Sequence, residues 1–232
     1  MKRVLLSWSS GKDSAWALHA LRGDATVTVV GLLTTLNGPA DRVAMHAVRR
    51  ELLEIQAAAA GLPLVTVGLP SPCTNDEYER LIGATIAEAR GRGVTHVAFG
   101  DLFLEDVRAY RIRTLAGTGI DPMFPIWSSP AGTRSLALRM IQSGIRARIT
   151  CVDAAHLDPS FLGREFNEEL LADLPPSVDP CGERGEFHTF CHSGPGFAGS
   201  IPTVTGETEV SGQFHFIDLR ISAGPLVTSG LA

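Results

Sequence analysis

Short apolar runs alternate with amphipathic segments through the first half of the chain. Four of these runs predict buried strands, at residues 4–6, 25–33, 64–67 and 94–99. A fifth short strand or extended turn is predicted at residues 122–127. Helices are predicted between the strands at residues 13–21, 44–61 and 74–91, where apolar residues recur at helical spacing, and a charged helix is predicted at residues 105–115. This alternation is typical of an α/β fold with a doubly wound parallel sheet that helices cover on both faces.

The second half of the chain has a different pattern. Residues 132–141 predict one more helix, and residues 145–152 predict a strand of a second unit. Proline and glycine then punctuate residues 175–202, which show no helical period. Long irregular stretches in compact proteins are usually functional loops or disordered segments. We therefore expect a first domain at residues 1–130 and a smaller second domain at residues 131–232.

Residues 4–14, V-L-L-S-W-S-S-G-K-D-S, predict a buried strand, a tight turn and the start of a helix. The backbone N–H groups of the turn then lie at a helix N-terminus, which is a favourable site for phosphate. Lys12 adds a positive charge, and the hydroxyls of Ser9 and Ser14 can donate to the same oxygens. We call residues 9–14 the phosphate turn and expect the Lys12 side chain to lie in a solvated crevice. The alternative is a helix cap with an incidental lysine.

A Walker A loop also ends in Gly-Lys, but its pattern G-x-x-x-x-G-K-[ST] does not fit this turn. Leu6 stands where the first glycine belongs, and Asp13 follows Lys12. The turn therefore indicates phosphate binding by a different loop.

The end of the fourth predicted strand supplies a second group of candidates. Doubly wound sheets often have the strand order 3-2-1-4-5, which places Gly100 and Asp101 opposite the phosphate turn. There, Asp101 can hold Mg²⁺ or a ribose hydroxyl, and Gly100 lets the backbone approach a ligand. A turn aspartate that caps the next helix is the alternative. In that helix, Arg108 and Arg111 can bind phosphate or carboxylate, or can form a solvated face.

A third group lies inside the irregular stretch, in D-P-C-G-E-R-G-E-F-H-T-F at residues 179–190. Glu183, Glu186 and His188 form a polar cluster suited to binding an amine, orienting a nucleophile or moving protons. A metal site that adds Cys181 and either Cys191 or His192 is one alternative. The other is a structural role, with His188 in a strand and Glu183 in a turn.

Composition and charge exclude several classes of protein. Lys and Arg number 20 against 25 Asp and Glu, a net charge of −5, and no basic run is long enough for a nucleic-acid footprint. The four cysteines form no C-x-x-C pair, which argues against an iron–sulfur or zinc-ribbon site and favours free thiols. Neither a signal-peptide core nor an apolar run of about 18 residues is present, so we expect a cytoplasmic protein.

The S-x-G-K-D-S spacing of the phosphate turn resembles the PP-loop of ATP pyrophosphatases, within the adenine nucleotide alpha hydrolase-like superfamily. Together with Phe99-Gly100-Asp101 and G-E-R-G-E-F-H-T at residues 182–189, it resembles the diphthine–ammonia ligase family over nearly the whole chain. The resemblance implies a Rossmann-like nucleotide-binding domain of PP-loop type. It also implies a smaller C-terminal α+β domain that carries the second motif over the ATP site.

The same resemblance implies an ATP-dependent amide ligase. A substrate carboxylate attacks the α-phosphate of ATP, pyrophosphate stays in the phosphate turn, and ammonia then displaces AMP from the acyl-adenylate. The residues that would bind the nucleotide are Ser9, Ser10, Gly11, Lys12, Asp13, Ser14, Gly100 and Asp101. The catalytic residues would be Lys12, Asp13, Glu183, Glu186 and His188. Asp13 and Asp101 would also hold Mg²⁺. Arg108 and Arg111, which belong to neither group, would bind the substrate.

Several points stay open at this level. The acceptor is either diphthine on a protein or a small-molecule carboxylate, such as a corrinoid precursor. The nitrogen donor and the oligomeric state, a homo-oligomer included, are not specified. Ser10 replaces a glycine of the usual S-G-G-K-D-S, which is tolerable where that residue keeps a negative φ. The alternative functions are a PP-loop tRNA-modifying enzyme and a non-catalytic ATP-binding sensor.

Overall fold

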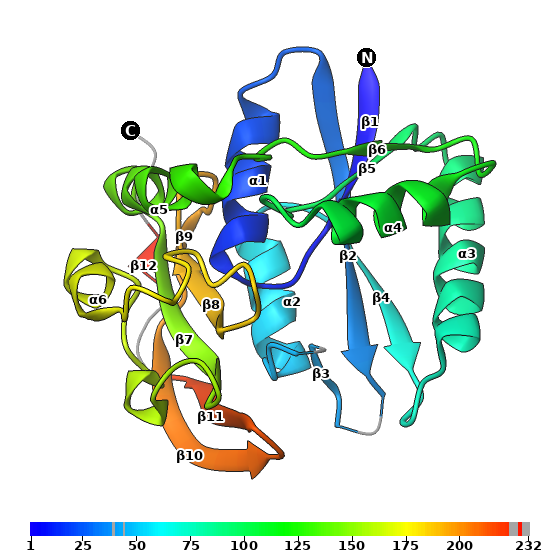
Figure 1. Ribbon diagram of the computed structural model, residues 1–232. Coiled ribbons are helices and arrows are strands. Elements are labelled where there is room, and N and C mark those ends of the chain that lie inside the picture. Colours follow the sequence, from blue (N-terminus) through cyan, green and yellow to red (C-terminus); the bar gives the residue numbers. More distant parts are fainter. Residues whose placement is uncertain (39, 44, 223–226, 229–232) are drawn as a thin grey trace.

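The first half of the chain forms a parallel sheet with the predicted strand order (Figure 1). We describe a computed structural model that covers residues 1–38, 40–43, 45–222 and 227–228. Its parallel strands are β1 (Lys2–Ser7), β2 (Val27–Asn37), β4 (Leu64–Leu69), β5 (His96–Ala98) and β6 (Asp121–Met123). They lie in the order β4-β2-β1-β5-β6, so the first and fourth parallel strands are neighbours as expected. A two-residue strand, β3 (Arg42–Val43), pairs antiparallel with the end of β2.

Helices cover both faces of this sheet because its strands are apolar on both sides. Val4 and Leu6 of β1 belong to one buried cluster with α1 (Lys12–Arg22) and α2 (Arg50–Ala59). Leu5, between them, belongs to a second cluster with α3 (Asn75–Gly91) and the end of α4 (Glu105–Leu115). Alternate residues of a strand point to opposite faces, so two cores result. Thr74 accepts a hydrogen bond from Glu77 N and caps α3, and α4 has the predicted bounds.

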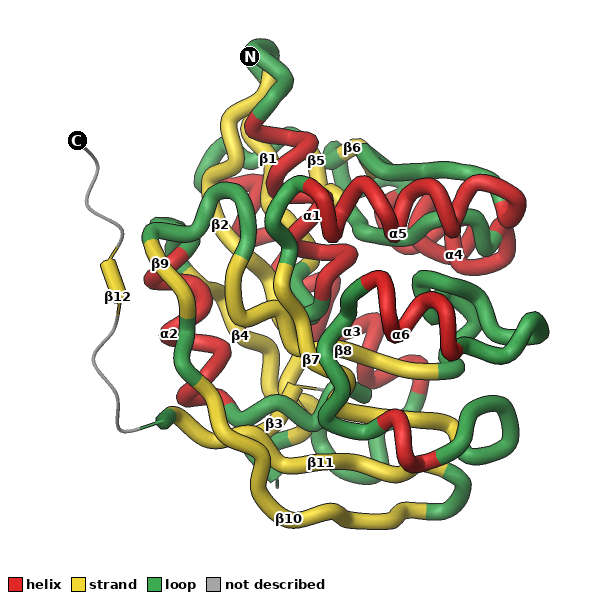
Figure 2. Tube along the Cα trace, turned by 90° about the vertical axis from the view of Figure 1, so that its left-hand side faces the viewer, coloured by secondary structure: helices red, strands yellow, loops and turns green. Residues whose placement is uncertain are grey.

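The second half of the chain forms a separate antiparallel sheet in the order β10-β11-β7-β8 (Figure 2). Its strands are β7 (Arg146–Asp153), β8 (Phe187–Ser193), β10 (Thr203–Ser211) and β11 (Phe214–Ile221). The helical elements here are α5 (Thr133–Gln142), α6 (Glu168–Asp173) and the 3-10 turns Pro130–Gly132 and Pro159–Phe161. A short pair joins β9 (Gly199–Ser200) and β12 (Val227–Thr228). The predicted α/β class with a smaller C-terminal α+β part is therefore confirmed.

Two predictions from the pattern are wrong in detail. Residues 175–202 were expected to be irregular, yet β8 and β9 lie within them, because the seven residues of β8 are too few to show a period between glycines. The helix expected from residue 44 begins only at Arg50. The β10–β11 hairpin had no prediction at all, and its mostly exposed β10 lacks the apolar alternation that marks a half-buried strand.

The two halves of the chain share one apolar core. The buried cluster on the α1–α2 face continues through Met140 of α5 and Ile149 of β7 to Phe190 of β8. On its border, Asp218 of β11 accepts hydrogen bonds from Arg42 and Arg49, at 2.8–2.9 Å. These contacts hold β8 against the end of the first sheet where β1 leads into the phosphate turn.

Candidate active site

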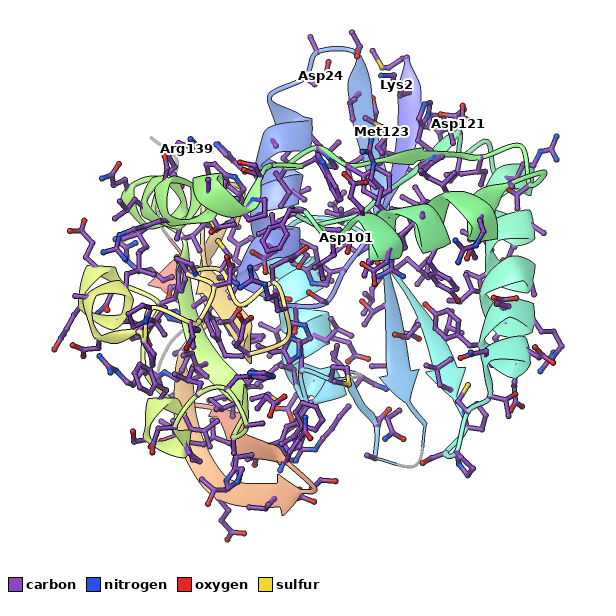
Figure 3. All side chains as sticks on the ribbon, viewed as in Figure 1. Lys2, Asp24, Asp101, Asp121, Met123 and Arg139 are labelled. Atoms are coloured by element: carbon purple, nitrogen blue, oxygen red, sulfur yellow. The ribbon has the colours of Figure 1, made fainter. Side chains whose placement is uncertain are left out.

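A cavity of about 370 Å³ lies where the phosphate turn meets the second motif. Its walls combine three groups of residues that are far apart in the sequence. The phosphate turn contributes Ser9, Lys12, Asp13 and Ser14. The end of the fourth parallel strand contributes Gly100 and Asp101, and the second motif contributes Gly182, Glu183, His188 and Thr189. Leu33, Ile82, Ile86 and Phe99 give the cavity an apolar part. Figure 3 shows Asp101 between α1 and α4, away from the labelled Lys2 and Asp121 at the amino ends of β1 and β6.

The phosphate turn is built as predicted, as a tight turn that opens α1. Gly11 caps the helix without a side-chain hydrogen bond, and the Ser9 hydroxyl accepts from Gly11 N at 3.3 Å. The Ser14 hydroxyl donates to Gly11 O at 2.9 Å, and Lys12 N donates to the Thr189 hydroxyl at 3.1 Å. The positive end of α1 therefore faces the cavity, which suits an anion.

Ser10 has the backbone conformation of a glycine. Its φ is 69°, so the expectation of a negative φ at this position is wrong. The Ser10 carbonyl accepts from Cys191 N at 2.9 Å and from the Gln56 side chain at 2.9 Å. Within the described residues, the buried Ser10 hydroxyl has no hydrogen-bond partner. Two contacts from outside the turn therefore impose a conformation that costs serine energy.

Lys12 lies in the interior and not in a solvated crevice. The residue is 1% exposed, and its ammonium group donates to the Cys181 carbonyl and, at 2.9 Å, to Asp13 Oδ2. The ring centroids of Phe166 and Phe187 lie 5.3 and 5.2 Å from Nζ. Burial acts to lower the pKa of Lys12, but the Asp13 carboxylate, together with Cys181 and Glu183, outweighs burial, so the pKa is raised. Lys12 thus carries a full charge at the cavity wall and also joins the two halves of the chain.

Asp101 faces the cavity beside the phosphate turn, as the strand order predicts. Its Oδ2 lies 3.4 Å from Arg111 Nε, and burial raises the pKa of the Asp101 carboxyl. A Cβ on Gly100 would lie 3.2 Å from the backbone of Asp13 and Ser14. Glycine at position 100 therefore lets the end of the strand pack against α1. This reason for a glycine differs from the expected one, which was close approach of the backbone to a ligand.

The two arginines of α4 have different positions. Arg111 lines the cavity, pairs with Asp101 and lies over the Phe99 ring at 4.9 Å. Arg108 is not among the described residues that line the cavity. Its guanidinium lies over the rings of Trp127 and Phe124, at 4.7 and 5.2 Å. Only Arg111 is therefore placed to contact a bound substrate.

The two glutamates of the second motif also differ in position. We call residues 179–186 the carboxylate loop. Glu183 reaches the cavity, where its Oε1 accepts from Leu102 N at 2.7 Å, and burial raises its pKa to about 7. Glu186 is 2% exposed and accepts from Asp179 N at 2.8 Å and from Arg184 N at 3.0 Å. Glu186 therefore shapes the loop and does not line the cavity.

His188 of β8 lines the cavity next to a histidine that the sequence did not single out. The ring centroids of His188 and His46 are 4.7 Å apart. His46 follows β3 in a segment that reads as a loop, so only its spatial position reveals it.

No group of three or more His, Cys, Asp or Glu among the described residues is arranged to hold a metal ion, which disfavours the cluster with Cys181, Cys191 or His192.

Comparison with known proteins agrees with the two-part arrangement. Residues 1–118 match the model of the diphthamide synthase N-terminal domain, and residues 133–222 match that of the diphthamide synthase C-terminal domain. A diphthine–ammonia ligase of Rattus norvegicus is 27% identical over 251 residues, which cover 99% of this chain and 91% of the rat protein. None of the described helices combines the length and apolar character needed to cross a membrane.

Proposed function

The chain belongs to the diphthamide synthase family, and on this premise we propose that it is an AMP-forming amide ligase. Family membership implies a ligase that uses ATP. The observation that carries the finer proposal is one cavity whose opposite walls are the phosphate turn and the second motif. An anion site and proton-accepting side chains then lie within reach of one substrate.

In the first step, a substrate carboxylate attacks the α-phosphate of ATP and releases pyrophosphate, leaving an acyl-adenylate. The N-terminus of α1 and the Ser9 and Ser14 hydroxyls would bind the phosphates, and the apolar wall with Leu33 and Phe99 would receive the base. Lys12 stabilises the charge that grows on the leaving pyrophosphate. It acts from a fixed position, so no reorganisation is needed during the reaction.

Asp13 and Asp101 are the residues that would hold Mg²⁺. The fit rests on Asp13, whose Oδ1 is buried and lacks a hydrogen-bond partner within the described part of the chain. Carboxylate oxygens suit this ion, which usually keeps one or two of them together with substrate phosphates. When bound, Mg²⁺ neutralises phosphate charge.

In the second step, ammonia attacks the acyl carbon and AMP leaves. Starting from ammonium, the formation of the amide releases two protons. Glu183, with a pKa of about 7, is the cavity group we assign to accept the first proton, and the second passes to solvent. Glu186 acts indirectly, as a positioning residue, by holding the backbone of the carboxylate loop.

The acceptor is a carboxylate that enters beside Arg111, either diphthine on a protein or a small molecule. Arg111 already pairs with Asp101, so a substrate carboxylate would share its guanidinium, whose five N–H donors allow this. Arg108, which packs on Trp127, has no part in this proposal.

The test follows the exchange of labelled pyrophosphate into ATP. The purified protein is given Mg²⁺, ATP and either a translation elongation factor that carries diphthine or a small-molecule extract of its own source. Exchange that needs the acceptor but not ammonium, followed by AMP and amide when ammonium is added, supports both steps. ADP as the product would contradict the proposal.

The matched control is Lys12→Met, which keeps an unbranched apolar side chain and removes the charge that lies over the Phe166 and Phe187 rings. Loss of one preorganised group of this kind typically lowers turnover by about 10²–10³-fold. Exchange at the wild-type rate in this variant would remove the PP-loop assignment. ATP that binds but stays intact with both acceptors would favour a sensor.

A further inference from the structure

His46 and His188 form a pair of imidazoles that connects the phosphate turn with β8. His46 Nδ1 lies 2.9 Å from the Thr189 carbonyl oxygen. A carbonyl only accepts hydrogen bonds, so Nδ1 carries the hydrogen and Nε2 is the basic atom. A Cβ on Gly11 would come within 2.8 Å of His46 Cε1, so the ring lies directly against the turn. The pair therefore borders the place where phosphates would bind.

The backbone that carries His46 is strained. Asp41, Met45 and Ala47 all have positive φ, at 51°, 63° and 54°. Each such residue costs energy, and such strain persists where surrounding contacts impose it, commonly at ligand-binding sites. His46 is thus held at the turn by more than local preference.

Both imidazoles are uncharged at neutral pH. Burial and the nearby Lys12 lower the pKa of His46 to about 4, and burial, His46 and Lys12 lower that of His188 well below its usual range. His188 Nε2 is buried and has no hydrogen-bond partner among the described residues. A buried polar atom without a partner is costly, and a bound ligand would relieve that cost.

The charges around the pair do not by themselves suit a polyanion. The charged side chains that line the cavity are Lys12, Asp13, Asp101, Arg111 and Glu183. Lys12 pairs with Asp13 and Arg111 pairs with Asp101, which leaves Glu183 as the excess charge. Tyr78 and Tyr110 also line the cavity. A nucleotide triphosphate would therefore enter a site with a small negative balance.

Resting on the proposed ATP site, we propose that His46 and His188 together take up one proton when the phosphates of a nucleotide bind. The imidazolium supplies a positive charge that this cavity lacks in the free protein, and its N–H groups donate to phosphate oxygens. The proton comes from solvent and returns to it when pyrophosphate and AMP leave, so the pair is unchanged after each turnover.

The direction of the shift follows from the local field. In the free protein, the Lys12 ammonium disfavours protonation of both rings. Several phosphate charges would reverse that field, and an opposite charge at close range typically moves a pKa by about 1–3 units. Because two protonated rings at this distance would repel each other, the pair binds one proton and not two.

Calorimetry with Mg²⁺ and α,β-methylene-ATP, which cannot be cleaved at the relevant bond, tests this proposal. Between the pKa of about 4 of His46 in the free protein and the raised pKa of the complex, titrations in two buffers of different ionisation enthalpy should show uptake of up to one proton per nucleotide, and affinity should fall by up to tenfold per pH unit as the pH rises. Above the pKa of the complex, both the uptake and this pH dependence should disappear. The nucleotide's own phosphates, whose second pKa of about 6 lies in this range, would release protons equally in the wild type and in the variant described below.

The key variant is the double substitution His46→Asn with His188→Asn. Asparagine at 46 places an amide nitrogen near the position of Nδ1, so the bond to Thr189 can persist while the titrating group is removed. This variant should bind the analogue more weakly, with no proton uptake and little pH dependence. His192→Gln, on the same strand but bonded to Glu165, should behave as wild type.

Four outcomes decide the matter. Wild-type binding without proton uptake overturns the proposal, as does uptake that persists in the double variant. Uptake that disappears in Glu183→Gln instead assigns the proton to that carboxyl and also overturns it. Absence of any nucleotide binding by the wild type would contradict the proposed function itself. The His Cε1 resonances of the wild-type protein, with and without the analogue, report the same protonation even where a variant fails to fold.

Discussion

The phosphate turn is held by contacts from outside it, whereas the carboxylate loop is held by its own side chains. In the turn, the Ser10 carbonyl accepts from Gln56 and Cys191, and Lys12 N donates to Thr189. In the loop, Asp179 accepts from Cys181 N and Glu186 accepts from Asp179 N and Arg184 N. The two walls of one cavity thus depend on different parts of the molecule.

The difference determines what each side chain can do. Outside contacts occupy the Ser10 carbonyl and the Lys12 N–H group and fix the shape of the turn, at the cost of burying Lys12 and straining Ser10. Internal contacts use up Glu186 and leave Glu183 and His188 for the cavity. Substitutions within the loop should therefore separate stability from activity, and substitutions in the turn should reveal stored strain.

The largest effect is expected from Glu186→Ala. The substitution leaves two buried N–H groups without their charged acceptor, which should lower the free energy of unfolding by roughly 3 kcal/mol. Glu183→Ala, three residues away, removes a half-buried carboxylate with one short bond and should cost only about 1 kcal/mol. Urea unfolding of both variants measures this. Equal losses would mean that the carboxylate loop does not depend on Glu186 as described.

Local and topological signals explain how much of this arrangement could be predicted. Apolar periodicity indicated the parallel strands, Thr74 marked the start of α3, and the strand order placed Asp101 opposite the turn. Each depends on residues close in the chain or on a general rule of sheet connection. Strand β10 carried no such signal, whereas the apolar residues of β11 are a signal that the prediction missed.

The remainder depends on contacts between distant segments. Lys12 is buried because Phe166 and Phe187, from the second half of the chain, close over it. His46 belongs to a loop, and it becomes a candidate site residue only because the fold places its ring beside that of His188. Glu183 and Glu186 are identical in type and separated by three positions. Only the path of the folded loop determines which one faces the cavity.

An intermediate effect is expected from the raised pKa of Glu183. Because burial raises this pKa from 4.5 to about 7, the folded state binds a proton that the unfolded state has already lost. The stabilisation from this group is therefore complete below about pH 4.5 and disappears as the pH rises through about 7. After allowance for solvent screening it amounts to roughly 2 kcal/mol.

Glu183→Gln removes this titration. The difference in unfolding free energy between wild type and variant, measured in urea at a series of pH values, should change steadily across that window. A difference that is independent of pH would mean that Glu183 is ionised in the folded protein, and would weaken its assignment as a proton acceptor in the cavity.

The smallest effect should come from the phosphate turn, through Ser10→Gly. Glycine adopts a φ of 69° without the steric penalty of serine, and the substitution also removes a buried hydroxyl that has no partner in the described part of the chain. Glycine loses more conformational freedom on folding, so the net gain should be about 1 kcal/mol. Ser9→Gly is the matched control, because the Ser9 hydroxyl accepts from Gly11 N and its loss should destabilise the turn. Thermal unfolding of both variants should therefore give shifts of opposite sign. A loss of stability in Ser10→Gly would mean that the turn is not strained and that its outside contacts do not impose its shape.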